Sequence, residues 1–157
     1  MKQTPLRIII FNWRDPKDPL SGGAERVTLK HAEYWVEVGH QVTWVSGVYE
    51  GAKNDEVRNG IRYLRVGSSK TLFLRAWWIF WFKLNGQFDV IIDEVHGLPM
   101  FSPLWKRNKK TIAFIHEVAQ EIWSEMFPFP ISTTGKLLEK YLFPAVYQGT
   151  PFWVDCD

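Results

Sequence analysis

Ser21-Gly22-Gly23-Ala24-Glu25 begins ten residues after Phe11, the last residue of the apolar run Leu6 to Phe11. This order predicts a buried strand, a turn and the start of a helix. Adjacent glycines let the backbone approach a ligand closely, and a helix that begins there directs N–H groups and its positive dipole end at the gap. The stretch indicates a site for an anionic, nucleotide-linked substrate, or else a plain helix N-cap in which Ser21 caps the helix.

Short apolar runs alternate with longer helical patterns along the rest of the chain. The alternation predicts an α/β fold, a Rossmann-like three-layer α/β/α domain with a mostly parallel sheet. A polar stretch, residues 54–60, reads as a turn before a strand that pairs antiparallel. We expect strands at residues 6–11, 41–45, 61–66, 88–92, 110–115 and 152–154, and helices at 23–38, 71–84 and 134–147.

Length and composition limit the class of protein. The 157 residues fit one domain, so residues 1–157 are taken as a single unit. One cysteine, Cys156, excludes an internal disulfide framework, and the first apolar run is too short for the core of a signal peptide. We therefore expect a cytoplasmic protein. A net charge of +2, without a nucleic-acid-binding motif, argues against nucleic acid as a partner.

Polar residues are concentrated in the segments that follow the predicted strands. In a parallel sheet, ligands bind outside the carboxyl ends of the strands. Three strand ends carry chemistry-bearing side chains there, which packing needs alone rarely produce. They are Arg14 and Asp15 after the first run, Asp93, Glu94 and His96 after the fourth, and His116, Glu117 and Glu121 after the fifth.

Several short blocks carry a resemblance to a known family. They are Asn12-Trp13-Arg14-Asp15, Gly22-Gly23-Ala24-Glu25, Asp93-Glu94, Leu98-Pro99, Ile115-His116 and Glu121-Ile122-Trp123. Together they resemble the N-terminal half of a family 4 glycosyltransferase over essentially the whole chain. Enzymes of this family have the GT-B fold, in which two Rossmann-like domains face each other across a cleft. The resemblance implies retaining transfer of a sugar from a nucleotide-diphosphate donor to a hydroxyl acceptor, with no cofactor and no essential metal.

The resemblance also implies a division of labour between domains. The N-terminal domain supplies most of the acceptor site, and a C-terminal domain, absent from these 157 residues, holds most of the nucleotide sugar. We expect the 157-residue chain alone to turn over no donor. The alternative is a stand-alone Rossmann-like module that binds a nucleotide or another anion, or one subunit of a split enzyme.

Roles for single residues follow from the same resemblance. His116 is the catalytic candidate, as a hydrogen-bonding group to the transferred sugar or its acceptor. The N–H groups of Gly22, Gly23 and Ala24 are expected at the donor diphosphate. The residues assigned to the acceptor side and its support are Arg14, Asp15, Glu25, Glu94, His96 and Glu121.

Some of these assignments keep two interpretations. Glu25 either caps its own helix, which we favour, or touches substrate. Arg14 and Asp15 either contact substrate or lock the first loop through an ion pair. Because adjacent strand residues point to opposite faces, only one of Asp93 and Glu94 faces the cleft, and Glu94 is favoured.

The predicted helix at residues 71–84 is apolar on nearly every side and contains Trp77, Trp78 and Trp81. It is shorter than the roughly 20 residues that a membrane span needs. It is either packed on the sheet or lies in the interface of a bilayer, where Lys70, Arg75 and Lys83 would meet anionic headgroups. The expected partners are a nucleotide sugar, a sugar, lipid-linked or polysaccharide acceptor, and the inner face of the membrane.

Overall fold

The computed structural model describes residues 4–68, 70–84, 86–95, 98–105, 110–116, 123–124 and 128–154. Its strands are β1 (Arg7–Phe11), β2 (Gln41–Ser46), β3 (Asp55–Arg58), β4 (Ile61–Arg65), β5 (Val90–Val95), β6 (Lys110–Ile115) and β7 (Phe152–Val154). Its helices are α1 (Gly23–Glu37), α2 (Leu72–Ile79), α4 (Ile131–Leu137) and α5 (Phe143–Tyr147), with the π-helical segments η1 (Phe80–Leu84) and η3 (Leu138–Leu142) and the short helix η2 (Ser102–Leu104).

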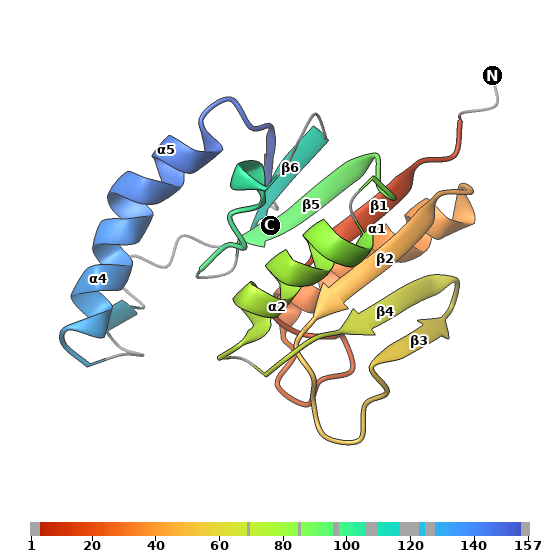
Figure 1. Cartoon of the computed structure of the whole chain (residues 1–157), viewed down its shortest axis with the longest axis horizontal. Coiled ribbons are helices and arrows are strands. Elements are labelled where there is room, and N and C mark those ends of the chain that lie inside the picture. The colour runs from red at the N-terminus through yellow and green to blue at the C-terminus, as the bar shows by residue number, and fades with distance from the viewer. Residues whose placement is uncertain are drawn as a thin grey trace.

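The strands form one seven-stranded sheet in the order β3-β4-β2-β1-β5-β6-β7 (Figure 1). Every neighbouring pair is parallel except β3 with β4. The chain builds one half of the sheet outward from β1 and then returns to place β5 on the other side of β1. The strand order therefore reverses between β1 and β5, and this is where open α/β sheets form a ligand-binding crevice.

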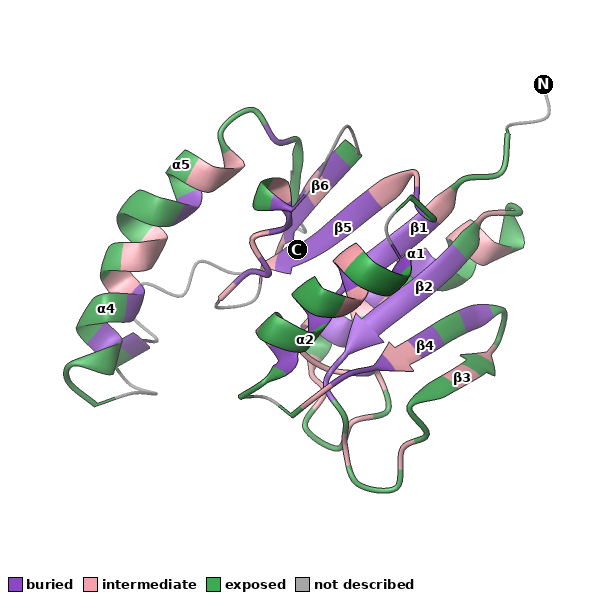
Figure 2. Cartoon of the chain, viewed as in Figure 1, coloured by how far each residue is buried: buried purple, intermediate pink, exposed green. Residues whose placement is uncertain are grey.

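Both faces of the sheet are covered, as the three-layer prediction requires. On one face, Ile9, Phe11 and Ile91 pack with residues of α2 and η1. On the other face, Ile8 and Ile10 pack with residues of α1. The central strands are accordingly buried along most of their length (Figure 2). The Rossmann-like α/β fold that the alternating pattern predicted is confirmed.

The edge of the sheet differs from the prediction. The polar stretch at residues 54–60 contains a strand, β3, which pairs antiparallel with β4 through a tight hairpin. Asn59 and Gly60 both have positive φ, which is the backbone that a two-residue hairpin turn requires. The strand that follows, β4, pairs parallel with β2 and antiparallel only with β3. The last helix also begins three residues earlier than predicted, at Ile131.

The helix rich in tryptophan packs one face on the sheet and leaves the other exposed. Leu72, Ala76, Phe80 and Leu84 are buried in the core. Trp77 and Trp78 lie on the outer face, 44% and 48% exposed. Trp81, also predicted to face a membrane, is less exposed than these two tryptophans, because its ring packs partly against the core.

A buried ion pair fixes the long loop after β1. Asp15 is fully buried, and its Oδ2 accepts hydrogen bonds from Nη2 and Nε of Arg65 at 2.6 and 2.9 Å. Oδ1 accepts from Arg58 at 3.2 Å and from the backbone N–H of Lys17 at 2.7 Å. Asp15 thus locks its loop to the edge hairpin, and its partners are arginines of β3 and β4 rather than the neighbouring Arg14.

Replacing Asp15 should therefore destabilise the protein strongly. The change Asp15→Ala leaves the buried guanidinium of Arg65 with only the partly exposed Glu56 carboxylate as counter-ion, at an expected cost of about 3 kcal/mol in unfolding free energy. The matched control is Asp55→Ala, which removes an exposed pair with Arg62 and should cost less than about 1 kcal/mol. Urea denaturation measures both values. Equal losses in the two variants would contradict the role given to Asp15.

Candidate functional site

The first turn of α1 lies at the carboxyl end of the sheet, after the loop that Asp15 fixes. Glu25 is buried and its Oε2 accepts a hydrogen bond from the backbone N–H of Gly22 at 2.6 Å. This is the capping role that we favoured for Glu25. It also corrects the prediction for Gly22, because the N–H expected to face a donor phosphate is bound to Glu25 instead. Helix geometry leaves the N–H groups of Gly23 and Ala24 without acceptors within α1.

Glycine at position 23 has no steric explanation within the described fold. Its φ is not in the left-handed region, and a Cβ placed there would meet no atom within 4 Å. A side chain at this position would instead project into the open space beside the first turn. This open space allows another group to approach the backbone closely.

Glu94, His116 and Thr28 form a cluster at the carboxyl ends of β5 and β6. Glu94 and Thr28 are fully buried, and the His116 side chain is 8% exposed. Oε2 of Glu94 lies 2.5 Å from Nε2 of His116, and Oε1 accepts from the Thr28 hydroxyl at 2.9 Å. The Thr28 hydroxyl is also 3.3 Å from Nε2 of His116. The cluster joins α1 to both strands and fixes the orientation of the imidazole ring.

Burial controls the protonation of this cluster. Removal from water raises the pKa of Glu94 to about 7, and hydrogen bonds from His116 and Thr28 oppose this shift. The Glu94 carboxyl, hydrogen-bonded to the His116 imidazole, therefore titrates close to neutral pH. Such a pair can hold a proton at one site or exchange it between two, which is a property of acid–base groups in active sites.

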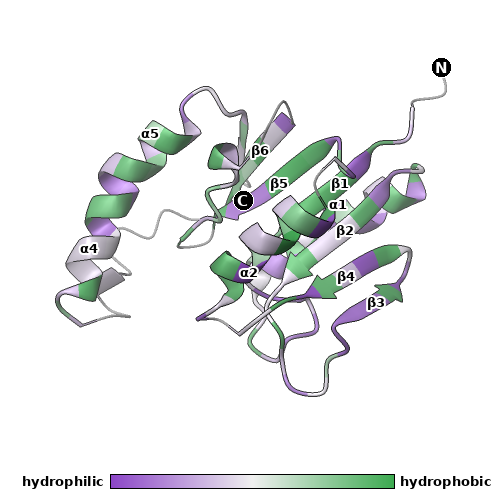
Figure 3. Cartoon of the chain, in the orientation of Figure 1, coloured by the Kyte–Doolittle hydropathy of each residue, from purple (hydrophilic) through white to green (hydrophobic). Residues whose placement is uncertain are grey.

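Asp93 points to the other face of the sheet and has a structural role. Figure 3 shows β5 turning from hydrophobic to hydrophilic towards its carboxyl end, where the two acidic residues lie. The Asp93 carboxylate accepts the backbone N–H groups of Met100 and Ser102 at 3.0 and 2.8 Å and the Tyr147 hydroxyl at 2.5 Å. Burial raises the pKa of Asp93, against these hydrogen bonds. Of the adjacent acidic pair, Glu94 is the one that lies beside His116.

The other predicted residues do not join this cluster within the described part of the structure. Arg14 lies half-buried in the first loop, where its carbonyl accepts the Trp44 indole N–H at 3.0 Å. Asp15 is occupied in the ion pair described above. His96 and Glu121 lie outside the described residues.

Sequence reasoning missed two residues of this region. Thr28 was not singled out, although a hydroxyl one turn after Glu25 on the inner face of α1 is the available signal. Asn12, directly after β1, is 1% exposed, and its Nδ2 has no partner among the residues that the structure describes. A buried amide of this kind at a strand end has a hydrogen bond left to give.

A family model decides the classification of the chain. The model of Glycosyltransferase Family 4 matches residues 21–148, which include α1, the Glu94–His116 pair and α5. The chain belongs to glycosyltransferase family 4. It corresponds to the N-terminal domain of such an enzyme, as the sequence blocks indicated.

The comparison with solved structures adds a weak likeness of fold. The C-terminal domain of the coenzyme A biosynthesis bifunctional protein CoaBC is similar to this glycosyltransferase domain, with 16% sequence identity and a TM-score of 0.48. The match covers 79% of this chain and 72% of that chain. No curated protein sequence matches the chain.

Within the described ranges, no three His, Cys, Asp or Glu side chains gather closely enough to hold a metal ion. None of the helices described is both long enough and apolar enough to cross a bilayer.

The raised pKa of Glu94 predicts how the stability of the folded protein depends on pH. The folded protein holds this proton more tightly than the unfolded chain, so the stabilisation is complete below about pH 4.5 and is lost as pH rises through about 7. In Glu94→Gln the loss should disappear, which changes the pH dependence of the unfolding free energy by up to about 3 kcal/mol. Denaturation series from pH 4 to 8 measure it.

The control for this series is Glu37→Gln, an exposed carboxyl on α1. It should reproduce the pH dependence of the unchanged protein. A Glu94→Gln profile that follows the unchanged protein would contradict the assignment.

Proposed function

We propose that this chain is the acceptor-side domain of a retaining glycosyltransferase that uses a nucleotide-diphosphate sugar and a hydroxyl acceptor in glycan or glycolipid synthesis. The observation that carries the proposal is the Glu94–His116–Thr28 cluster at the carboxyl edge of the sheet. Membership in glycosyltransferase family 4 supports the general class of reaction. The nucleotide sugar, the retaining course and the pathway are the proposal's own content.

The donor diphosphate is proposed to bind at the first turn of α1. The N–H groups of Gly23 and Ala24 point out of the helix end, and position 23 is open to close approach. Negative charge builds on the diphosphate as the sugar departs, and preorganised N–H groups stabilise such charge. Thr28 lies five residues after Gly23, roughly 8 Å along the helix axis. A sugar attached to that phosphate would therefore reach His116.

His116 is proposed to hydrogen-bond the transferred sugar or the acceptor hydroxyl. Its Nε2 is bound to Glu94, and no described residue bonds Nδ1. The Glu94 carboxylate orients the ring, and Thr28 holds Glu94. In the GT-B arrangement a second domain holds most of the nucleotide, so activity is to be measured on the complete gene product.

Removal of the His116 ring tests this proposal. In His116→Ala we expect kcat to fall by about 100-fold or more, because a positioned proton-transfer or hydrogen-bonding group is lost. The measurement is sugar transfer from a panel of nucleotide sugars, with circular dichroism to verify the fold. The matched control is His40→Ala, since His40 lies at the opposite, amino-terminal edge of the sheet. A His116→Ala rate within twofold of the unchanged enzyme would refute the role.

The outer face of α2 is proposed to rest on an anionic membrane. Leu74, Trp77, Trp78 and Phe82 are all exposed there, between 44% and 72%. The Lys83 ammonium lies 5.7 Å from the Trp78 ring centroid, which combines the interfacial aromatic with a cation. Tryptophan prefers the headgroup region, and cations bind anionic lipid.

Vesicle binding tests the membrane contact. The double variant Trp77→Ser, Trp78→Ser should weaken binding to vesicles containing phosphatidylserine by about tenfold, because two apolar rings no longer enter the interface. Tyr34→Ser is the control, since Tyr34 is an exposed aromatic on α1 at the opposite face of the sheet. Sedimentation with vesicles gives both affinities. Equal binding by the double variant and the unchanged protein would remove this proposal.

A further inference from the structure

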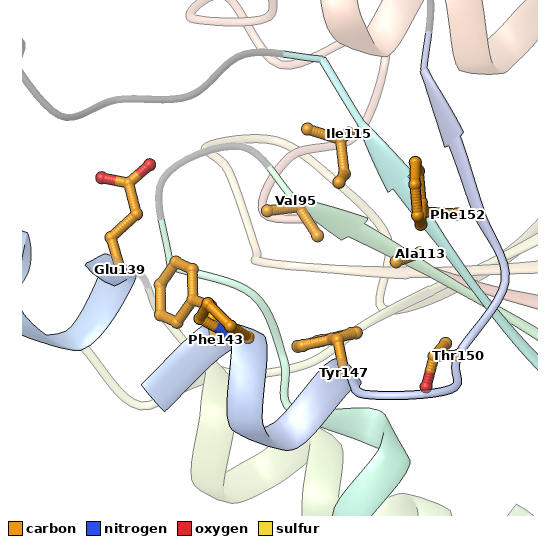
Figure 4. Close-up of a pocket in the computed structure, with 9 residues that line it drawn as sticks. Val95, Ala113, Ile115, Glu139, Phe143, Tyr147, Thr150 and Phe152 are labelled. Carbon is orange, nitrogen blue, oxygen red and sulfur yellow. The ribbon is translucent and has the colours of Figure 1, made fainter. Parts of the chain in front are cut away.

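An apolar pocket of about 260 Å³ lies between the sheet and α5 (Figure 4). Val95 at the end of β5 and Ala113 and Ile115 of β6 form its floor. Phe143 and Tyr147 of α5 form one wall. Phe152 of β7 forms another and is 70% exposed, so the pocket borders on solvent at that side.

Two of the three polar side chains that line this pocket are already hydrogen-bonded within the protein. The Tyr147 hydroxyl donates to Asp93 at 2.5 Å. The Glu139 carboxylate accepts the Trp123 indole N–H at 2.9 Å. Thr150 contributes one hydroxyl, and the remaining lining is aliphatic and aromatic carbon. A ligand that fills this space is therefore held mainly by burial of apolar surface.

The pocket adjoins the candidate site across the carboxyl edge of two strands. Glu94 and Val95 are consecutive in β5, as are Ile115 and His116 after β6, and Val95 pairs with Ile115 in the sheet. Because side chains alternate, Glu94 and His116 lie on the α1 face, and Val95 and Ile115 lie on the α5 face. A molecule that crosses this edge would contact the polar cluster with one end and the pocket with the other.

We propose that the pocket receives the apolar group of the acceptor, an alkyl chain or aromatic ring attached to the moiety whose hydroxyl is glycosylated. This inference rests on the proposed function and adds the chemical class of the acceptor. The volume supports it, because a cavity of about 150 Å³ holds one benzene ring. The pocket is larger than that, so it holds a short alkyl chain or one substituted ring.

Binding of simple glycosides tests the pocket without any donor. The probes are butyl, hexyl and octyl β-glucoside and phenyl β-glucoside, with free glucose as reference, titrated by calorimetry into the full chain. Burial of one methylene corresponds to about three- to fourfold in affinity, so we expect Kd to fall by about tenfold from butyl to hexyl glucoside. The phenyl probe distinguishes a ring from a chain as the occupant.

Variants locate the binding. Ala113→Leu fills the floor and should weaken octyl or phenyl glucoside binding by about tenfold or more. Phe152→Ala removes an exposed wall, so it should preserve the fold and weaken binding severalfold. Val154→Ala is the matched control, because Val154 lies on the same face of β7 outside the pocket lining and should leave Kd unchanged.

The outcomes separate this inference from the proposed function. Affinity that grows with chain length and is lost in Ala113→Leu and Phe152→Ala supports the pocket, whatever the His116→Ala rate shows. Chain-length dependence that both variants leave unchanged places the binding elsewhere, for instance on α2, and overturns the inference. Equal Kd for glucose and all glycosides overturns it too. A His116→Ala variant with full activity refutes the proposed function and leaves the binding result intact.

Discussion

The carboxyl edge of the sheet depends on the Asp93 carboxylate. This fully buried group accepts hydrogen bonds from two backbone N–H groups and from one phenol, and so joins the segment after β5 to α5. Met100 and Ser102 flank Phe101, a non-glycine residue with a φ of 55°. The two hydrogen bonds compensate for that unfavourable backbone. The third bond ties α5 to β5 and so creates the wall of the apolar pocket.

Asp93 and Glu94 together divide the edge into two environments. Consecutive buried carboxyl groups point to opposite faces, and the charge of Asp93 adds to the cost of ionising Glu94. On the α5 face, the Asp93 carboxylate binds the backbone N–H groups of Met100 and Ser102. On the α1 face, Glu94 holds an imidazole whose second ring nitrogen no described residue bonds. Structural and chemical roles are thus separated by the pleat of a single strand.

The sequence predicted most of the sheet, because central strands buried on both faces must be apolar runs. The strand β3 escaped prediction because Asp55-Glu56-Val57-Arg58 is polar, as an exposed edge strand is allowed to be. Trp81 is less exposed than Trp77 and Trp78 for a geometric reason. The π-helical turn of η1 adds residues per turn, so the face that follows α2 is rotated from an ideal helix.

Residue chemistry at the site was predictable only where backbone periodicity decides it. Alternation along β5 predicted that only one of Asp93 and Glu94 faces the cleft, and the position after the fifth predicted strand indicated His116. Backbone periodicity could not identify Thr28, because a single threonine in a helix carries no signal until its hydrogen-bond partners are known. The Gly22 N–H binds the Glu25 carboxylate. The sequence alone could not distinguish this contact from ligand binding, because a carboxylate and a phosphate are both stabilised at the amino end of a helix.

The ion pair of Asp15 has a consequence for how the molecule is connected. The loop that leads into the first turn of α1 is fastened to arginines of β3 and β4, at the far edge of the sheet. The hairpin at residues 54–60 therefore acts as a remote brace for the segment that precedes Gly22. A change in the length of that hairpin would therefore shift the first turn of α1, although the two segments are not neighbours in the chain.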